Sequence, residues 1–300
     1  MNIGIIGLGS VGGAIATAVH NTGVVREMVL FDRDPARSYA AAEDLGHASI
    51  FGFNVDIRSG QYSDFKGCDI VIIAAGANQK PGETRTDLLQ KNAVVIQDII
   101  PKLMRHADKK KVVLIIVSNP LDVMTKLAAE LSGLPAGRVI GTGTMLDSAR
   151  FKIILSRQLG VSATSLHAMI LGEHGDSSVA AWSAVRIGGL ELDEFCRQTK
   201  HGMTAATKKT IERRVKTAAY EIIKGRGATW DGIGAAAADL VRCVARDERR
   251  ILTVSLGDGS LPRIVGGSGV AATLHPKLDR AETAALKNSF RVIDGNWKKL

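Results

Sequence analysis

The sequence has few cysteines, few aromatic residues and no long hydrophobic run, and each shortage excludes a class of protein. Its three cysteines, Cys68, Cys196 and Cys243, are widely spaced and form no CxxC pair. We therefore expect no disulfide framework and no bound metal, but reduced thiols of the kind found in the cytoplasm. No run approaches the roughly 18 consecutive apolar residues of a membrane span. The chain opens directly on the strand-like run 3–6, without the basic region of a signal peptide, so we predict a cytoplasmic protein with no membrane contact.

The charge is positive but dispersed. The formal net charge of the 300 residues is +9, of which residues 1–140 carry +1 and residues 141–300 carry +8. Such an excess can bind nucleic acid. However, the longest basic run is Lys109-Lys110-Lys111, and aromatic residues make up only 4% of the chain, which leaves little capacity for stacking on bases. We favour a solvated surface that mildly attracts anions, and keep as an alternative a non-catalytic nucleotide-binding or nucleic-acid-binding protein.

The first half of the chain alternates short strand-like runs with helical stretches. The predicted strands are 3–7, 29–32, 69–76 and 112–118, and the predicted helices between them are 12–23, 35–45 and 92–106, the last kinked at Pro101. This alternation predicts an α/β fold with a doubly wound parallel sheet. The second half instead predicts helices at 147–159, 205–224, 230–247 and 281–297, and strands at 250–256 and 263–270 beside a 257–259 turn. We place a domain boundary near Gly141, giving domains of 1–140 and 141–300.

A glycine-rich turn follows the first predicted strand. In Gly7-Leu8-Gly9-Ser10-Val11-Gly12, Gly7 permits a tight turn, Gly9 lets backbone N–H groups approach a pyrophosphate, and Gly12 lets the helix pack closely on the strand. Asp32 follows 20 residues after Gly12, at the end of the second predicted strand. A carboxylate there accepts hydrogen bonds from both ribose hydroxyls and repels a 2′-phosphate, which favours NAD over NADP as cofactor.

His174 is the first candidate for proton transfer. An isolated histidine is usually a core residue, but this one lies between Gly172 and Gly175, in a segment typical of a loop that presents a side chain. Five segments, taken in order, resemble the signature motifs of the lactate/malate dehydrogenase family. They are Ala75–Arg85, Val117–Pro120, Gly141–Gly143, Leu146–Phe151 and Gly172–Asp176.

The resemblance covers nearly the whole chain and implies a Rossmann-type NAD-binding domain followed by an α+β substrate domain. It implies reversible hydride transfer between NADH and pyruvate in glycolysis, by a homo-oligomer, since family members are usually tetramers and sometimes dimers; we predict a homotetramer. His174 would exchange the proton with the substrate oxygen, and Asp147 would orient its imidazole. Arg150 would clamp the substrate carboxylate bidentately, and Arg85 would polarise the carbonyl. The resemblance also implies that Asn119 contacts the carbonyl side and the nicotinamide, and that Thr229 lines the substrate pocket.

Gln79 is the residue that would select the substrate. Malate dehydrogenases carry an arginine at the matching position, which pairs with the second carboxylate of oxaloacetate. With a neutral glutamine, a buried dicarboxylate would keep an unpaired charge, at a cost of several kcal/mol. Pyruvate is therefore favoured. We expect the segment from Gly76 to Arg85 to act as a lid, with hinges at Gly76 and Gly82 and a tip stiffened by Pro81.

Two further expectations rest on the same resemblance. Some bacterial members are activated by fructose 1,6-bisphosphate, and Lys152 and His167 stand at the matching positions. Because lysine replaces the arginine expected there, a tight bidentate anion site is not favoured. In addition, Trp230-Asp231 follows Thr229, where bacterial relatives often have two tyrosines. An acidic group near the pocket keeps a larger L-2-hydroxy acid, or malate with unusual specificity, as the alternative substrate.

Overall fold

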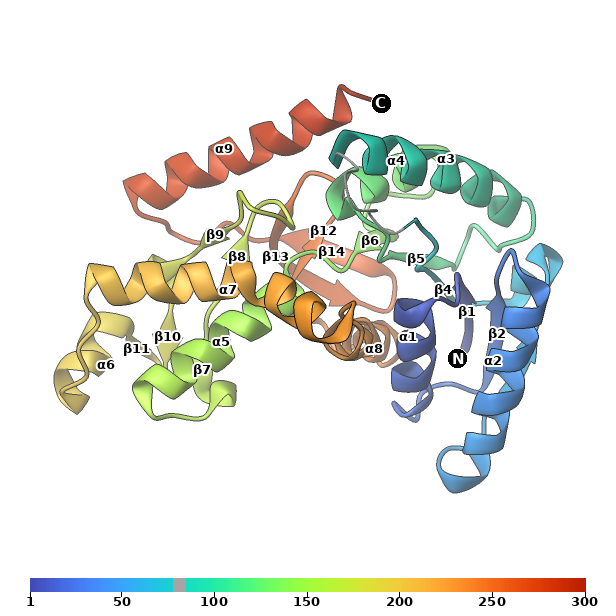
Figure 1. Cartoon of the computed structure of the whole chain (residues 1–300), viewed down its shortest axis with the longest axis horizontal. Coiled ribbons are helices and arrows are strands. Elements are labelled where there is room, and N and C mark those ends of the chain that lie inside the picture. The colour runs from blue at the N-terminus through green and yellow to red at the C-terminus, as the bar shows by residue number, and fades with distance from the viewer. Residues whose placement is uncertain (78–84) are drawn as a thin grey trace.

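A nine-stranded sheet forms the centre of the molecule (Figure 1). The computed structural model describes residues 1–77 and 85–300, and for Arg85 the backbone alone. Strands β1 to β6 are parallel and lie in the order β3-β2-β1-β4-β5-β6. This arrangement confirms the doubly wound sheet of Rossmann type. The six strands are β1 (Asn2–Ile6), β2 (Glu27–Phe31), β3 (Asp56–Ser59), β4 (Ile70–Ile73), β5 (Val113–Ile116) and β6 (Val139–Gly141).

The parallel strands are apolar on both faces because helices cover both sides of the sheet. In β4, Ile70 and Ile72 face one hydrophobic cluster while Val71 and Ile73 face the other, and all four are fully buried. Each such side chain contributes roughly 1.5–3 kcal/mol of burial free energy. One face packs against α1 (Ser10–His20), α2 (Pro35–Ala48) and α8 (Asp231–Ala245). The other packs against α3 (Arg85–Met104), which continues through Pro101, and α4 (Leu121–Ser132).

Three antiparallel strands from the second half of the chain extend the same sheet beyond β6. They are β12 (Arg250–Ser255), β13 (Ser260–Gly266) and β14 (Gly269–Thr273), and Ser255 pairs with Gly141 at the junction. The turn expected at 257–259 does connect two strands. Because one sheet runs through both halves, the division into two domains near Gly141 stays a proposal.

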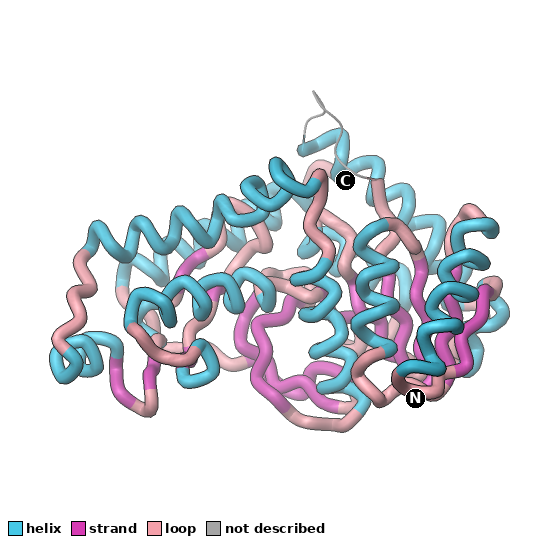
Figure 2. Tube along the Cα trace, turned by 60° about the horizontal axis from the view of Figure 1, so that its bottom comes forward, coloured by secondary structure: helices cyan, strands magenta, loops and turns pink. Residues whose placement is uncertain are grey.

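The rest of the second half builds a separate hydrophobic cluster around Phe151, whose ring meets that of Trp182 edge to face at 4.8 Å. Figure 2 shows the long strands running through the middle and right of the molecule, with the short strands at its left end. The helices are α5 (Met145–Leu159), α6 (Leu192–Thr199), α7 (Ala205–Arg226) and α9 (Arg280–Trp297). The short strands are β7 (Leu166–His167), β8 (Ile170–Leu171), β9 (Val179–Ala180), β10 (Arg186–Ile187) and β11 (Leu190–Glu191). The 3₁₀ turns are η1 (Ser49–Phe51), η2 (Tyr62–Gly67), η3 (Ala163–Ser165) and η4 (Trp182–Ala184).

The described ranges, 1–77 and 85–300, contain no helix with the length and apolar character needed to cross a lipid bilayer.

Candidate active site

Polar residues gather at one edge of the sheet because parallel strands end there together. Gly7 follows β1, Asp32 follows β2, Asn119 follows β5 and Thr142 follows β6. In doubly wound sheets this carboxyl edge is where ligands bind. The topology therefore collects at one place residues that are more than a hundred positions apart in the sequence.

The turn between β1 and α1 has the shape of a phosphate cradle. Gly7 has φ +92°, and a Cβ on Gly12 would lie 1.8 Å from the carbonyl oxygen of Gly7, so neither position tolerates a side chain. A Cβ on Gly9, in contrast, would meet no atom of the described residues within 4 Å. Within residues 1–77 and 85–300, no side chain caps the first turn of α1, which leaves its N–H groups and the positive end of the helix dipole available to an anion.

Asp32 is fixed next to this turn. Its Oδ2 accepts a hydrogen bond from the backbone N–H of Leu8 at 2.7 Å, and its Oδ1 accepts one from the backbone N–H of Asp34 at 3.0 Å. Arg37 lies 3.7 Å away and is half exposed, whereas Asp32 is buried. The cradle and this held carboxylate fit the pyrophosphate and ribose of a dinucleotide.

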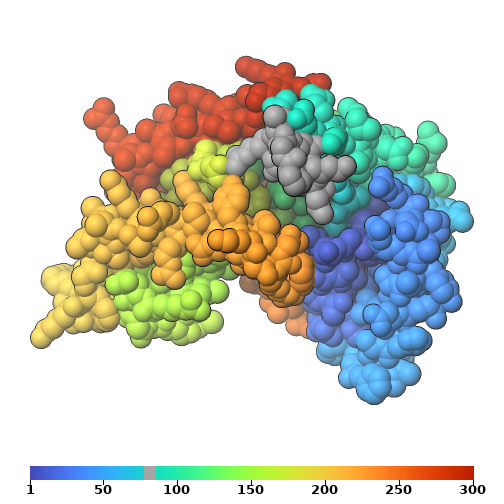
Figure 3. Space-filling model, in the orientation of Figure 1, coloured from blue at the N-terminus to red at the C-terminus, as the bar shows by residue number. Residues whose placement is uncertain are grey.

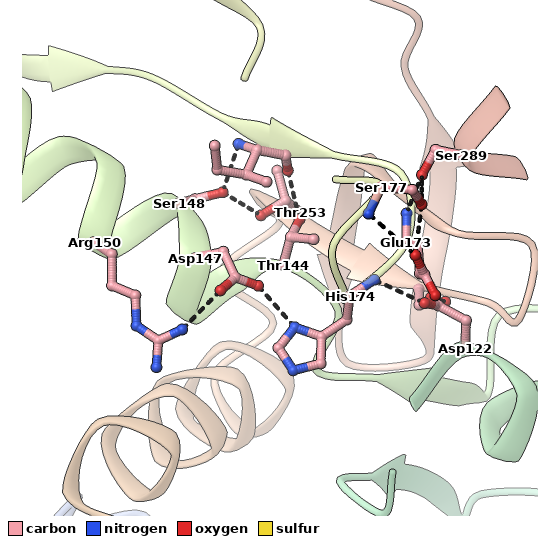
Figure 4. Close-up of polar contacts among 12 residues, drawn as sticks. Asp122, Thr144, Asp147, Ser148, Arg150, Glu173, His174, Ser177, Thr253 and Ser289 are labelled. Carbon is pink, nitrogen blue, oxygen red and sulfur yellow. Dashed lines mark hydrogen bonds and ion pairs between the residues drawn. The ribbon is translucent and has the colours of Figure 1, made fainter. Parts of the chain in front are cut away.

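Three charged residues form a connected group at the start of α5 and in the loop between β8 and β9 (Figure 4). Asp147 Oδ2 and His174 Nδ1 are 2.7 Å apart, and Asp147 Oδ1 accepts a hydrogen bond from Arg150 Nη1 at 2.8 Å. The second ring nitrogen of His174, Nε2, bonds to no residue of the described ranges and lies on the side of the ring away from Asp147. The geometry leaves Nε2 free to exchange a proton with a ligand.

The charges of this group shift the pKa values of its two titrating side chains in opposite directions. Burial is the largest influence on His174 and lowers its pKa, but the Asp147 carboxylate and, after it, Asp122 outweigh burial, so the pKa of His174 lies above its usual value. Burial likewise raises the pKa of Asp147, yet His174 and Arg150 bring that pKa below its usual range. The pair therefore favours a protonated imidazole beside an ionised carboxylate.

A cavity of about 200 Å³ brings the predicted substrate residues together. Its wall includes Asn119, Arg150, His174 and Thr229, with apolar side chains from α1, α5, α7 and α8 around them. On the face shown in Figure 3, the C-terminal part of α7 (orange) borders the N-terminal segment (dark blue). Val11, in the first turn of α1, also lines the cavity, so the cavity lies beside the phosphate cradle.

Two residues of the site were not predicted from the sequence. Asn92 of α3 donates from Nδ2 to the carbonyl oxygen of Asn119 at 2.6 Å and accepts from the backbone N–H of Ala77 at 2.7 Å. Asp122 of α4 accepts a hydrogen bond from the backbone N–H of His174 at 2.8 Å. Both side chains form hydrogen bonds with the backbone of a residue far away in the sequence. The spacing of residues along the sequence does not indicate such contacts.

Some predicted residues lie outside the described part of the chain. Gln79, Pro81 and Gly82, and with them the proposed lid, fall outside the described residues, as does the side chain of Arg85. Their roles stay predictions.

Lys152 and His167 are described, but no hydrogen bond or ion pair within residues 1–77 and 85–300 joins them. Lys152 lies on α5, where burial and then the charge of Arg250 lower its pKa. His167 is exposed on β7, and its backbone lies opposite Arg186 of the antiparallel strand β10. The anion site implied for these two residues stays a prediction.

The chain matches two family models that together cover nearly all of it. Residues 1–141 match the model described as lactate/malate dehydrogenase, NAD binding domain. Residues 144–299 match the model described as lactate/malate dehydrogenase, alpha/beta C-terminal domain.

Individual relatives and solved structures agree with these models. The chain is 46% identical to an L-lactate dehydrogenase of Thermus aquaticus, over 98% of each chain. It is 42% identical to one of Deinococcus radiodurans, over 100% of this chain and 99% of the relative. The crystal structure of a minor L-lactate dehydrogenase from Enterococcus mundtii in a ligands-bound form superposes with a TM-score of 0.94, at 35% identity and covering 100% of this chain and 98% of that one.

Proposed function

Since the chain belongs to the lactate/malate dehydrogenase family, we propose that it is an NAD-dependent L-lactate dehydrogenase, which reversibly transfers a hydride between NADH and pyruvate. The observation that carries this proposal is the hydrogen-bonded group of His174, Asp147 and Arg150, of which His174 and Arg150 line one cavity beside a dinucleotide cradle. A proton donor and an anion clamp side by side are what the reduction of a 2-oxo acid requires.

NAD is the cofactor, and when bound it supplies the hydride that a ketone accepts and an alcohol returns. The chain's own residues bind and orient it. The open N-terminus of α1 and the bare backbone at Gly9 take the pyrophosphate, and the carboxylate of Asp32 takes the ribose hydroxyls. The negative charge of Asp32 also disfavours the 2′-phosphate of NADP.

Arg150 holds the substrate by its carboxylate in this proposal. Its Nη1 bonds to Asp147, and the remaining donors of the planar guanidinium have no partner within residues 1–77 and 85–300, so they can form a bidentate pair with a carboxylate in the cavity. Its side chain is only 14% exposed, so water competes little for the pair. Lysine could not replace it in this geometry.

His174 moves the proton. Nε2 gives a proton to the ketone oxygen of pyruvate as the alcohol forms, and takes it back when lactate is oxidised. Asp147 holds Nδ1, which fixes the ring orientation and stabilises the imidazolium before the transfer. In our proposal Arg85 polarises the carbonyl, Asn119 contacts the carbonyl side and the nicotinamide, and Thr229 bounds the pocket.

The preference for pyruvate over oxaloacetate rests on charge balance. In the proposed closed lid, Gln79 faces the methyl group of pyruvate and offers no cation to a second carboxylate. Asp231, the acidic residue that suggested a different substrate, accepts a hydrogen bond from Arg226 at 2.6 Å and is not part of the cavity wall. Its charge therefore has a partner outside the pocket.

The proposal is tested by NADH oxidation with pyruvate, oxaloacetate and 2-oxoisocaproate, in the wild type and in Gln79→Arg. The wild type should prefer pyruvate, and Gln79→Arg should shift the preference toward oxaloacetate by at least about tenfold, because one buried charge pair is worth several kcal/mol. Gln198→Arg, which adds the same charge on the exposed face of α6 and outside the cavity wall, is the control and should leave the ranking unchanged. A wild type that prefers oxaloacetate, or a ranking unmoved by Gln79→Arg, would contradict the substrate assignment.

Assembly, location and regulation complete the proposal. We place the enzyme in the cytoplasm as a homotetramer that functions in glycolysis, by analogy with its family. Adding fructose 1,6-bisphosphate to the same assay tests Lys152 and His167. We expect a weak response, because the ammonium of Lys152 offers a point charge where an arginine would offer a planar fork for bidentate bonding.

A further inference from the structure

Asp122 is a buried carboxylate that the proposed mechanism does not yet use. It lies in the first turn of α4, three residues after Asn119, and is 3% exposed. Its Oδ2 accepts a hydrogen bond from the backbone N–H of His174 at 2.8 Å (Figure 4), and its Oδ1 accepts one from the hydroxyl of Ser255 at 2.6 Å. Both carboxylate oxygens are thus engaged, one of them by the residue that carries the proton.

Packing alone does not account for an acid at this position. Burial raises the pKa of Asp122, and the hydrogen bonds from Ser255 and from the His174 backbone oppose that rise only in part. An asparagine has almost the same shape and could accept from the His174 N–H and donate to Ser255 without burying a charge. The acidic group therefore costs stability that an amide would not.

The loop that carries His174 is anchored at two successive residues. Besides the bond from His174 to Asp122, the backbone N–H of Glu173 donates to the hydroxyl of Ser289 on α9 at 2.8 Å. Ser289 is fully buried, and a Cβ on Gly172 would lie 2.4 Å from its oxygen, so the loop lies tightly against α9. The two anchors differ in one respect, because Ser289 is neutral and Asp122 is acidic.

We infer that Asp122 is a positioning residue for the proposed reaction: it fixes the His174 backbone from the α4 side while Asp147 fixes the ring, and its charge stabilises the imidazolium. The inference rests on the proposed function for its kinetic readout. Asp122 also connects two parts of the cavity wall, because it bonds to His174 and lies on α4, which begins directly after Asn119 and Pro120.

Several charged groups surround the imidazole and bear on the test. Asp147 and Arg150 face it from α5, Asp122 from α4, and Glu173 precedes it in its own loop. The positive charge of Arg263, on β13, acts on Asp122 rather than on the ring, and its direct partner is Asp258 at 2.6 Å. Removal of the Asp122 charge should therefore lower the pKa of His174 without removing the larger influence of Asp147.

The test compares Asp122→Asn, Asp122→Ala and Ser289→Ala in the full-length protein. Asp122→Ala should reduce kcat for pyruvate by about 10- to 100-fold, because a base misplaced by about 1 Å loses that much. Its Kd for NADH should change by less than about twofold, since the cradle lies elsewhere. Asp122→Asn should retain most of the wild-type kcat at low pH. The pH at which its activity falls should lie about half a unit below that of the wild type. Ser289→Ala, a neutral anchor, should lower kcat without moving the pH profile.

The inference fails if Asp122→Asn has the wild-type pH profile, or if Asp122→Ala loses NADH binding in proportion to kcat, which would mark a purely structural role. Wild-type protein without pyruvate turnover would refute the proposed function instead. In that case the imidazole pKa of His174, measured by NMR and assigned with His174→Asn, decides the inference independently. A lower pKa in Asp122→Asn supports it, and an unchanged pKa overturns it.

Discussion

Asp147 is the residue on which the site depends, because its single carboxylate serves two cationic partners. One oxygen meets His174 Nδ1 at 2.7 Å and the other accepts from Arg150 Nη1 at 2.8 Å. The carboxylate is 12% exposed, so these interactions are weakly screened. Because its own pKa is lowered, Asp147 stays ionised while the imidazole gains and loses its proton.

The raised pKa of His174 gives a pH dependence with a definite sign. Reduction of pyruvate needs the imidazolium, so it should persist above the ordinary histidine value of 6.5 and fall as pH rises through the raised pKa. Oxidation of lactate needs the neutral ring and should fall as pH drops through the same value. Asp147→Asn removes the main cause of the rise, so kcat/KM for pyruvate should break at a pH lower by about one unit or more.

This pH prediction is checked by profiles of kcat/KM in both directions for the wild type and Asp147→Asn. Asp176→Asn, in the same loop but exposed, is the control and should leave the break in place. An Asp147→Asn enzyme with the wild-type break would show that another group controls the titration.

Two glycines of the turn between β1 and α1 should have different effects, one on the stability of the fold and the other on cofactor binding. A Cβ on Gly12 would overlap the carbonyl of Gly7, so Gly12→Ala should lower the free energy of unfolding by about 1–3 kcal/mol or more. Gly9 has an extended backbone with φ −68° and open space where its Cβ would be. Gly9→Val should therefore keep the stability within about 0.5 kcal/mol but raise the Kd for NADH at least about tenfold.

Urea unfolding and NADH titration of the two variants distinguish these effects. Equal losses of stability in both variants, or undiminished NADH affinity in Gly9→Val, would argue against the turn as the pyrophosphate site.

Elements with a strong local pattern were predictable from the sequence, and those defined by long-range pairing were not. The apolar runs that became β4 and β5, and helices α5, α7 and α9, follow from periodicity and flanking residues. The two-residue strand β7 exists only because it pairs with β10, 20 residues later. Nothing local indicates that β12 joins β6 through Ser255 and Gly141.

The same distinction applies to the site. The structure places His174, Arg150 and Asn119 around one cavity, with Asp147 bonded to His174 behind it, while their roles stay predictions. The sequence gives no functional signal for Asp122, because an acid in the first turn of a helix already has a local explanation in the helix dipole. Its partner is 52 residues away, beyond the reach of a spacing argument.

At the scale of the whole molecule, the surface suggests association. Several large apolar side chains are exposed on the single chain, among them Tyr39 (61%) on α2, Phe51 (92%) on η1 and Ile153 (44%) on α5. Burial of such groups between subunits would remove apolar surface from water. We expect a tetramer with about four times the 31.8 kDa of one chain. Light scattering after size exclusion measures this mass, and a stable 31.8 kDa species at micromolar concentration would contradict it.

The central claim is that His174 is the proton donor and acceptor of an NAD-dependent reduction of pyruvate. The most direct test is pyruvate-dependent NADH oxidation by His174→Asn beside the wild type, with NADH binding measured in both. The account predicts a loss of turnover of at least about 100-fold with Kd for NADH changed less than about twofold, because the histidine acts on the proton and not on the cofactor. Full turnover in His174→Asn would contradict the account.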